Sequence, residues 1–334
     1  MKFLLIPTVG SAILAGISLV TPAFATVNID YVTIGDAGNA ADPLTGSLYG
    51  AVAYDYKIAK NETTIAQYAE FLNAVAKTDS YGLYTASMTD SHINGISQSG
   101  VSGSFTYSVA TGSANRPITF VSWFDAARFS NWLQNGQQTG LGAALTAETG
   151  AYTLNGATSG IILKNVGATV WIPTEDEWYK AAYFDPNQGG LGVGGYWQLA
   201  NQSNTGAGNT IGVANSANYF DGDFVGSGNA IYPTGNGLTD VGAYGLNSAS
   251  AYGTNDQTGN VYEWNDAVIS DSMRGRRGGA WWSLGYNLFS SSRYDSGPWG
   301  EYDDFGFRVA SVPEPTSILL TMLAGGVMLI RRKR

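Results

Sequence analysis

The sequence predicts an α+β fold that is rich in loops, with short strands and about three short helices. Forty-four glycines and 20 tyrosines in 334 residues favour turns and large buried rings over long regular elements. Short alternating apolar segments between Gly-, Asn- and Asp-rich loops are typical of strands. Three Ser or Thr residues stand in helix N-cap patterns. The length suffices for a sizeable core, organised as one large domain or two at most.

Four segments carry the strand pattern. Residues 27–33 and 54–58 alternate apolar and polar side chains and predict the first two strands. A small hairpin is expected near residues 103–109, and residues 118–121 predict a further strand. From 187 to 255 the chain is mostly Gly, Asn and aromatic loop, and no repeat period is evident.

Three capping patterns predict helices over about 65–77, over about 123–134, and from Glu175 through Tyr183. In each, the side chains at the N-cap and three residues later can satisfy free backbone N–H groups at the helix start. The adjacent acids Glu175 and Asp176 complement the helix dipole in a first turn, which is a simpler reading than a catalytic carboxylate pair. The capping pairs are Thr64 with Gln67, Ser122 with Asp125, and Thr174 with Glu177.

The net charge of −9 argues against nucleic acid as a partner. Five of the 17 basic residues are Lys2 and the four that close the chain, so the remainder has 12 bases against 26 acids, a net charge of −14. Binding to nucleic acid depends on Lys and Arg that neutralise phosphates. Cations, neutral glycans and basic surfaces remain open as partners.

The absence of cysteine and the single histidine exclude several kinds of chemistry. A chain without thiols forms no disulfide, zinc-thiolate site or iron-sulfur cluster, and it has no cysteine nucleophile. A Ser-His-acid triad would need His92, which lies in a polar loop without a nucleophile-elbow motif.

The first 25 residues have the pattern of a secretory signal peptide. Lys2 precedes an apolar run over 3–20, and Ala23 and Ala25 form the small-x-small pattern of a signal peptidase site. The mature chain is therefore expected to begin at Thr26. The alternative is an uncleaved anchor helix, which the glycines and the proline within the run oppose.

The C-terminal end resembles the PEP-CTERM sorting signal of Gram-negative bacteria that produce exopolysaccharide. Pro313, Glu314 and Pro315 precede an apolar run over 318–330 and a basic end. This run is short for a full membrane span of about 20 residues. The resemblance implies an exosortase as partner, transient membrane contact through 316–330, and a final location at the cell surface or outside the cell. The alternative is a simple C-terminal anchor.

Several blocks, in the family's order, resemble the formylglycine-generating-enzyme/sulfatase-modifying-factor domain. The resemblance implies a modified C-type-lectin-like fold over residues 26–311, between a signal peptide at 1–25 and a sorting signal at 312–334. The blocks are residues 56–68, 116–133, 172–178, Gly259-Asn260-Val261-Tyr262-Glu263-Trp264, 277–280 and Gly306-Phe307-Arg308-Val309.

The residues of the family's active site are replaced. Members that make formylglycine use two cysteines, and a serine just before them, to bind copper. Here the serine position falls on Ala280, the first cysteine on Ser283 and the second on or near Leu288. Without thiolates the soft-metal site cannot form. We therefore expect no copper and no formylglycine-generating activity.

The loop from Asp256 to Glu263 predicts a structural calcium site, because two carboxylates and free carbonyls in one tight turn suit a hard cation. The resemblance implies Asp256 and Glu263 as side-chain ligands, with carbonyl ligands at Gly259 and Val261. The alternative is a solvated turn acid plus a buried acid paired with an arginine such as Arg308 or Arg293. The resemblance also implies a second calcium site that begins at Asn218 and the Tyr219 carbonyl.

The candidate ligand-binding residues flank the position where the family binds its substrate. They predict a groove in which tryptophans stack on a sugar, and the alternative is core and inter-loop packing. We expect a non-catalytic, calcium-stabilised module that binds exopolysaccharide or another glycan, or a scaffold without a ligand. The other alternative is an enzyme that reuses the cleft through Asp295, Asp303 or Asp304. The candidate set is Trp281, Trp282, Ser283, Arg293 and Trp299.

Overall fold

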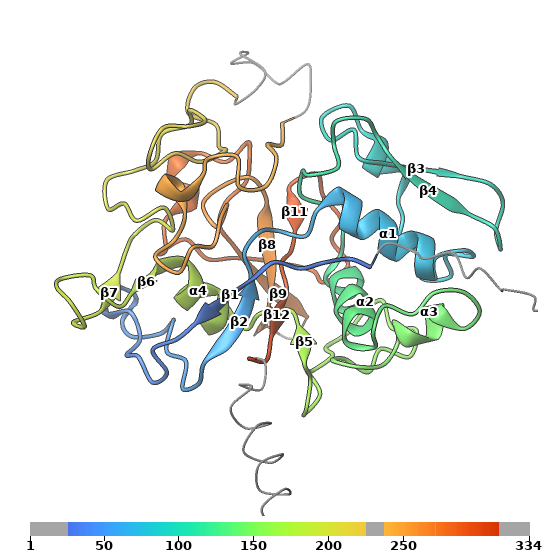
Figure 1. Ribbon diagram of the computed structural model, residues 1–334, viewed down its shortest axis with the longest axis horizontal. Helices are drawn as coiled ribbons and strands as arrows, with labels where there is room; N and C mark the ends of the chain where they lie inside the picture. Colours follow the sequence, from blue (N-terminus) through green and yellow to red (C-terminus); the bar gives the residue numbers. More distant parts are fainter. Residues whose placement is uncertain (1–25, 225–236, 271, 314–334) are drawn as a thin grey trace, which may run out of the picture.

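A computed structural model describes residues 26–224, 237–270 and 272–313 (Figure 1). The predicted signal cleavage site at Ala23 and Ala25, the sorting residues Glu314 and Pro315, and the segment 316–330 lie outside the described residues. Within them, no helix has the length and apolar character needed to cross a membrane.

The three predicted helices are confirmed. They are α1 (Ile65–Val75), α2 (Trp123–Gln134) and α4 (Glu175–Tyr183), and each begins with a closed capping box. In α1, for example, the Thr64 side chain accepts from the Gln67 N–H while the Gln67 side chain accepts from the Thr64 N–H. A one-turn helix, α3 (Ala143–Thr146), was not predicted.

The first sheet brings the two ends of the described chain together. It has the order β1 (Tyr31–Ile34), β2 (Tyr56–Ala59), β12 (Ala310–Ser311) and β5 (Val170–Trp171), and all neighbours are antiparallel. Ala310 lies opposite both Ile58 and Trp171, so the last strand closes the sheet between early and middle segments.

The second sheet has the order β10 (Tyr294–Ser296), β9 (Met273–Arg277), β8 (Tyr262–Ser270) and β11 (Phe305–Gly306). The strands β8 and β9 form a long antiparallel hairpin, and β11 runs parallel to β8. Figure 1 shows this sheet at the centre, with α1, α2 and α3 on one side of the molecule and α4 on the other.

Two small hairpins and four 3-10 helices complete the described elements. The hairpins are β3 (Ile96–Ser99) with β4 (Thr106–Val109), and β6 (Phe184–Asp185) with β7 (Gly195–Tyr196). Long loops connect them, as the composition predicted. The 3-10 helices are η1 (Pro43–Thr45), η2 (Ala86–Thr89), η3 (Leu246–Ser248) and η4 (Gly285–Leu288).

The strand predicted at 118–121 was wrong. Phe120 adopts a left-handed conformation with φ of 56°, which breaks an extended segment. The backbone N–H of Ile118 bonds to Thr63 and that of Phe120 to Tyr302, so the segment bridges two loops instead of joining a sheet. The first strand begins at Tyr31, later than the predicted 27–33, and the first hairpin begins at Ile96, before the predicted range.

Aromatic rings join α1 and α2 to the segment that follows β11. The Phe71 ring on α1 and the Phe129 ring on α2 meet edge to face at 5.5 Å, and Phe129 meets Phe307 in the same way at 5.4 Å. All three are fully buried. Large rings that interlock in this way hold the segment after β11 against α2, which fixes Arg308 beside the sheet.

Candidate functional site

The second sheet has two faces of different chemistry. Neighbouring residues of a strand point to opposite faces, so Tyr262 and Glu263 on β8 separate them. The strand register places Glu263 opposite Arg277, which defines a buried ionic face. The other face carries rings, with the Arg276 guanidinium among them. Its members are Tyr262, Trp264, Arg276, Tyr294 and Phe305.

On the ionic face, Glu263 pairs with Arg308. Arg308 Nε lies 2.6 Å from Glu263 Oε2 and Nη2 lies 2.7 Å from Oε1, and neither side chain is exposed. Trp178 Nε1 also donates to Oε2 at 2.8 Å. The remaining donors of Arg308 reach the carbonyls of Ala59, Lys60 and Asn255. Every polar group of this buried pair therefore has a partner, as low polarity requires.

A second ionic group lies on the same face. Arg277 and Arg293 both bind the Glu175 carboxylate, at 2.8 and 2.7 Å. Glu175 is the first residue of α4, so this group joins the helix to β9 and the loop before β10. The Arg293 side chain is 31% exposed and its charge is already paired. Its predicted role in ligand binding would require that pair to open.

Hydrogen bonds and close backbone packing hold the loop before β8 in its conformation. Asp256 has φ of 63°, its Oδ2 accepts from the Gly242 N–H at 2.6 Å, and burial raises its pKa to about 6. Gly259 has φ of +86° and packs against the Asn218 backbone, where a Cβ would collide. The Val261 N–H donates to Glu62 Oε1 at 3.3 Å. These contacts give each residue a structural role.

The predicted calcium ligands do not converge as a site through Glu263. Both Glu263 oxygens accept from Arg308, and a guanidinium at that distance would repel a divalent cation. Among the described residues, no group of three or more His, Asp or Glu side chains is arranged to hold a metal. The contacts match the alternative of an arginine-paired acid. Calcium at this loop stays a prediction, and it requires Glu263 to leave Arg308.

The second predicted calcium site gives a different result. Asn218 is buried and its Oδ1 has no hydrogen-bond partner among the described residues, while its Nδ2 donates to Gly237 and Asn260. A buried amide oxygen without a partner fits a cation or water ligand. The Tyr219 ring is buried, and its hydroxyl donates to Ala207. Calcium here also stays a prediction.

The opposite face of the sheet opens into a groove of about 470 Å³. Five separate segments contribute to it: β8, β9, the stretch from residue 282 to η4, β10, and the loop that enters β11. Half of the lining residues are aromatic, and polar groups lie between the rings. The lining residues are Tyr262, Arg276, Trp282, Ser283, Leu284, Tyr286, Asn287, Tyr294, Ser296, Tyr302, Asp304 and Phe305.

The rim of the groove is exposed and aromatic. Trp282 is 51% exposed, Tyr286 63% and Tyr302 54%. Exposed large rings grouped around a cavity, rather than scattered singly, mark a binding surface. Inside, Ser283 Oγ donates to the Tyr262 hydroxyl at 3.3 Å and accepts from the Ala280 N–H at 2.9 Å. Ser283, which the sequence resemblance aligned with the family's first cysteine, is therefore held at the groove wall.

Arg276 and Asp304 are the charged residues that line the groove. The Arg276 guanidinium lies over the rings of Tyr262 and Phe305, at 4.4 and 4.3 Å from their centroids, and burial lowers its pKa. Burial raises the pKa of Asp304 to about 7, an effect that Arg276 partly counters. Asp304 therefore titrates near neutral pH.

The structure separates the candidate ligand-binding residues. Trp282 and Ser283 line the groove. Trp281 is 1% exposed and its indole stacks on His92 at 6.3 Å, so it packs in the core, the alternative raised by the sequence. Trp299 is 56% exposed but folds over Gly297 and does not line the groove.

Sequence reasoning missed most of the groove. Its tyrosines come from β8, β10, η4 and the loop before β11, and Arg276 comes from β9. The available signal was alternation, since Arg274 and Arg276 share one face of β9, and Tyr294 and Ser296 share one face of β10. Of the acids considered for catalysis, Asp304 lines the groove, whereas Asp295 and Asp303 do not.

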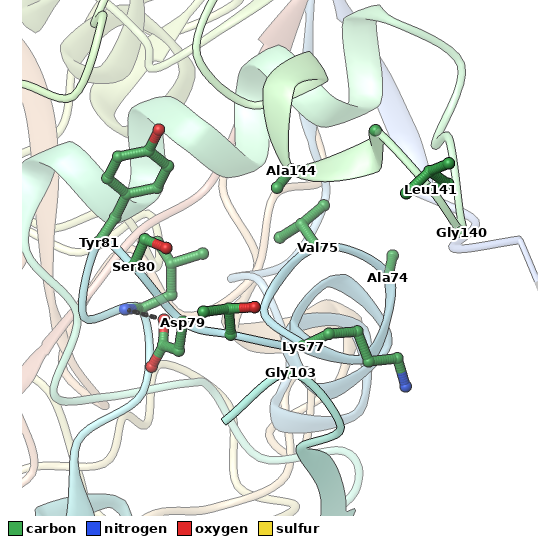
Figure 2. A pocket seen from close by; sticks show the side chains of 13 residues that line it. Ala74, Val75, Lys77, Asp79, Ser80, Tyr81, Gly103, Gly140, Leu141 and Ala144 are labelled. Carbon is green, nitrogen blue, oxygen red and sulfur yellow. Dashed lines mark hydrogen bonds between the residues drawn. The ribbon is translucent and has the colours of Figure 1, made fainter. Parts of the chain in front are cut away.

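A second cavity, of about 420 Å³, lies at the end of α1 (Figure 2). Figure 2 shows Asp79, Ser80 and Tyr81 on one side, with Gly140 and Leu141 on the other. The Asp79 carboxylate accepts from the N–H groups of Leu83 and Tyr84 and so stabilises its own turn. None of the candidate residues lies here, and the exposed ring cluster of the first groove has no counterpart.

Comparison with known families gives one match that covers most of the chain. The sequence model of the sulfatase-modifying factor enzyme 1-like domain matches residues 48–312. No curated protein matches the sequence.

The chain is similar to several solved structures. Treponema denticola variable protein 1 is 19% identical, with a TM-score of 0.50 over 88% of this chain and 100% of that chain. CarF is 20% identical, with a TM-score of 0.47 over 86% and 99%. PvdO from Pseudomonas aeruginosa is 16% identical, with a TM-score of 0.43 over 85% and 92%. At these identities the likeness to the Treponema denticola protein speaks for the fold alone, a loop-rich mixture of sheets and few helices.

Proposed function

The chain belongs to the sulfatase-modifying factor enzyme 1-like domain family, and we propose that it is a carbohydrate-binding module and not a formylglycine-generating enzyme. The observation that carries this proposal is the groove of about 470 Å³ on the ring-bearing face of the second sheet. It is concave, half aromatic and rimmed by exposed rings, as carbohydrate sites need to be for sugar faces to stack on them.

The polar groups of the groove suit sugar hydroxyls. Ser296 supplies a hydroxyl that can donate and accept. Asn287 accepts from the Leu284 N–H and donates to the Tyr294 hydroxyl, which leaves one amide N–H and one lone pair of its carbonyl oxygen for a sugar. Peptide-binding grooves instead use exposed strand edges or apolar pockets for successive side chains. The alternating rings and small polar groups therefore favour a glycan over a peptide.

The chemistry of formylglycine generation is excluded by composition. The chain has no cysteine, and the position of the family's serine is Ala280, which is buried. Ser283 stands at the position of the first cysteine, and its hydroxyl is engaged with Ala280 and Tyr262. A hydroxyl cannot supply the soft ligand that copper needs.

A second candidate function is hydrolysis in the same groove. Asp304 favours it, since a carboxyl that titrates near pH 7 in a cleft is a candidate acid or base. Glycosidases, however, use two carboxylates that flank the bond, and Asp304 is the one described carboxylate that lines the groove. Binding without catalysis is therefore the better-supported function.

The proposal places the module outside the cell. The signal peptide pattern at 1–25 and the resemblance of 312–334 to a PEP-CTERM signal support export, sorting by an exosortase and a final position at the surface or in the matrix. An exopolysaccharide is the carbohydrate such a module would meet there.

The test is co-sedimentation of the purified protein with the exopolysaccharide of the producing organism. We expect retention by the wild-type chain and weaker retention by Trp282→Ala, with Leu246→Ala as the matched control, because Leu246 is exposed and outside the groove. Failure of the wild-type chain to sediment with any polysaccharide would overturn the proposal. Release of shortened sugars would favour the enzyme.

A further inference from the structure

Arg276 differs from the arginines beside it on β9. Arg274 holds Asp266 at 2.9 Å and Arg277 holds Glu175 at 2.8 Å. In the described parts of the chain, Arg276 forms no ion pair, and the hydrogen bond it makes there runs from Nε to the Asp295 carbonyl at 3.4 Å. A guanidinium has five N–H donors. The two Nη groups of Arg276 therefore have donors available for a ligand.

The Arg276 guanidinium is also held in place. It lies over the rings of Tyr262 and Phe305 at 4.4 and 4.3 Å, and the Tyr294 ring is 5.6 Å away. Stacked rings fix the plane of the guanidinium, so less side-chain entropy is lost when it binds a planar anion. Partial burial strengthens the attraction further, because water screens it less.

The rest of the molecule does not present a general basic surface. The net charge is −9, so attraction of an anion to this groove would come from a local group and not from the overall field. Asp304 also lines the groove. At a pH below about 7 its carboxyl is mostly neutral because it is buried, and a neutral carboxyl can donate to an anionic ligand instead of repelling it.

We propose that the groove selects an anionic carbohydrate, and that Arg276 binds the carboxylate of a uronic acid residue. This inference rests on the proposed function and names its ligand class. The sugar rings stack on the aromatic rim formed by Trp282, Tyr286 and Tyr302. The carboxylate takes the bidentate geometry that guanidinium and carboxylate groups share.

The experiment compares two polymers with the same backbone. The full chain is titrated calorimetrically with polygalacturonate and with the same polymer after its carboxyl groups are reduced to alcohols. We expect the wild-type chain to bind polygalacturonate at least about tenfold more tightly, which corresponds to about 1.4 kcal/mol. The preference should fall as salt is raised, since the charges are partly exposed.

Arg276→Gln should bind both polymers alike, and Arg276→Lys should keep part of the preference because it keeps the charge. Arg293→Gln is the matched control, because Arg293 is paired with Glu175 outside the groove. A thermal melt shows whether Arg276→Gln folds. If Arg276→Gln does not fold, the inference is tested by the preference of Arg276→Lys for polygalacturonate and by the loss of the wild-type preference as salt is raised.

The outcomes separate the two claims. Equal wild-type affinity for both polymers overturns the role of Arg276 and leaves carbohydrate binding intact. Loss of the preference in Arg293→Gln overturns the assignment to the groove. Binding to neither of these polymers, nor to the exopolysaccharide, overturns the proposed function together with this inference.

Discussion

Arg308 and Glu263 form a two-point ion pair in which both side chains are fully buried, with distances of 2.6 and 2.7 Å. The pair ties β8 to the segment after β11, and the Arg308 donations to the Ala59 and Lys60 carbonyls tie both to the end of β2. The two sheets of the fold therefore meet at one guanidinium. Two buried charges of this kind depend on each other, because each is the main compensation for the lost hydration of the other.

We expect Glu263→Gln and Arg308→Met each to lower the free energy of unfolding by about 3–5 kcal/mol, because each leaves one buried charge unpaired. Urea denaturation of the purified chain measures this. The double variant should lose less than the sum of the two single losses. Arg293→Gln is the control, and we expect it to cost less, since Arg277 still holds Glu175. A loss below about 1 kcal/mol in Glu263→Gln would contradict the structure.

Added calcium should leave the melting temperature of the wild-type chain unchanged if Glu263 keeps its pair with Arg308. The physical reason is that a cation at this loop must displace a guanidinium from both carboxylate oxygens. Differential scanning calorimetry in calcium and in chelator checks it. A stabilisation by calcium that Asp256→Ala removes would instead establish the predicted site. If Asn218→Ala removes the stabilisation by calcium instead, the ion lies at the second predicted calcium site, which begins at Asn218.

Gly259→Ala should destabilise the protein more than Gly253→Ala. Both glycines have φ of +86°, so alanine suffers the same backbone strain of about 1 kcal/mol at either position. A Cβ at Gly259 would also collide with the Asn218 backbone, whereas at Gly253 no atom lies within 4 Å. Denaturation midpoints of the two variants measure the difference. Equal midpoints would show that the Asn218–Gly259 contact yields readily.

Trp282→Ala and Tyr286→Ala should weaken carbohydrate binding by roughly tenfold each without loss of stability, because both rings are exposed at the rim of the groove. Trp299→Ala should have a smaller effect, since that ring is exposed but outside the groove. Affinity electrophoresis in gels that contain the polysaccharide measures the affinities of all three variants. An equal loss in Trp299→Ala would extend the site beyond the described groove.

The chain should be more stable at pH 5 than at pH 8. Burial raises the pKa of Asp304 and of Asp266 to about 7, in the second case despite the Arg274 ion pair. A carboxyl whose folded pKa exceeds its unfolded value, about 3.9, binds more protons in the folded state, so the free energy of unfolding falls as pH rises towards 7.

Urea midpoints at the two pH values measure this dependence, and Asp304→Asn should reduce the difference between them. An Asp304→Asn variant whose midpoints change with pH as strongly as those of the wild-type chain would show that Asp304 does not carry the effect.

The helices were predictable from sequence because their signals are local. Thr64 and Gln67 lie three residues apart, and the contact that they form depends on little else. The strand at 118–121 failed for the opposite reason. Its composition suits a strand, but Phe120 adopts a left-handed conformation and its backbone N–H bonds to Tyr302, far away in the sequence.

The groove could not be assembled from sequence, since five separate segments build it. The size of the tryptophans made them candidates for ligand binding. Trp281 and Trp282 are neighbours in the chain, yet Trp281 lies in the core and Trp282 at the surface. The choice between calcium and arginine at Glu263 was equally non-local. It depends on where the backbone places Arg308, 45 residues later.

The alternation of Tyr262 and Glu263 along β8 has a use in protein engineering. The Arg308 and Arg277 ion pairs lie on one face of the second sheet, and the exposed rings of Trp282, Tyr286 and Tyr302 rim the groove on the other, so the two sets share no side chain. Randomising Trp282, Tyr286 and Tyr302 would therefore sample new surfaces while the Arg308 and Arg277 ion pairs keep the scaffold folded. The domain offers a cysteine-free display framework, suited to libraries expressed in reducing compartments, whose recognition surface can be rewritten independently of its stability.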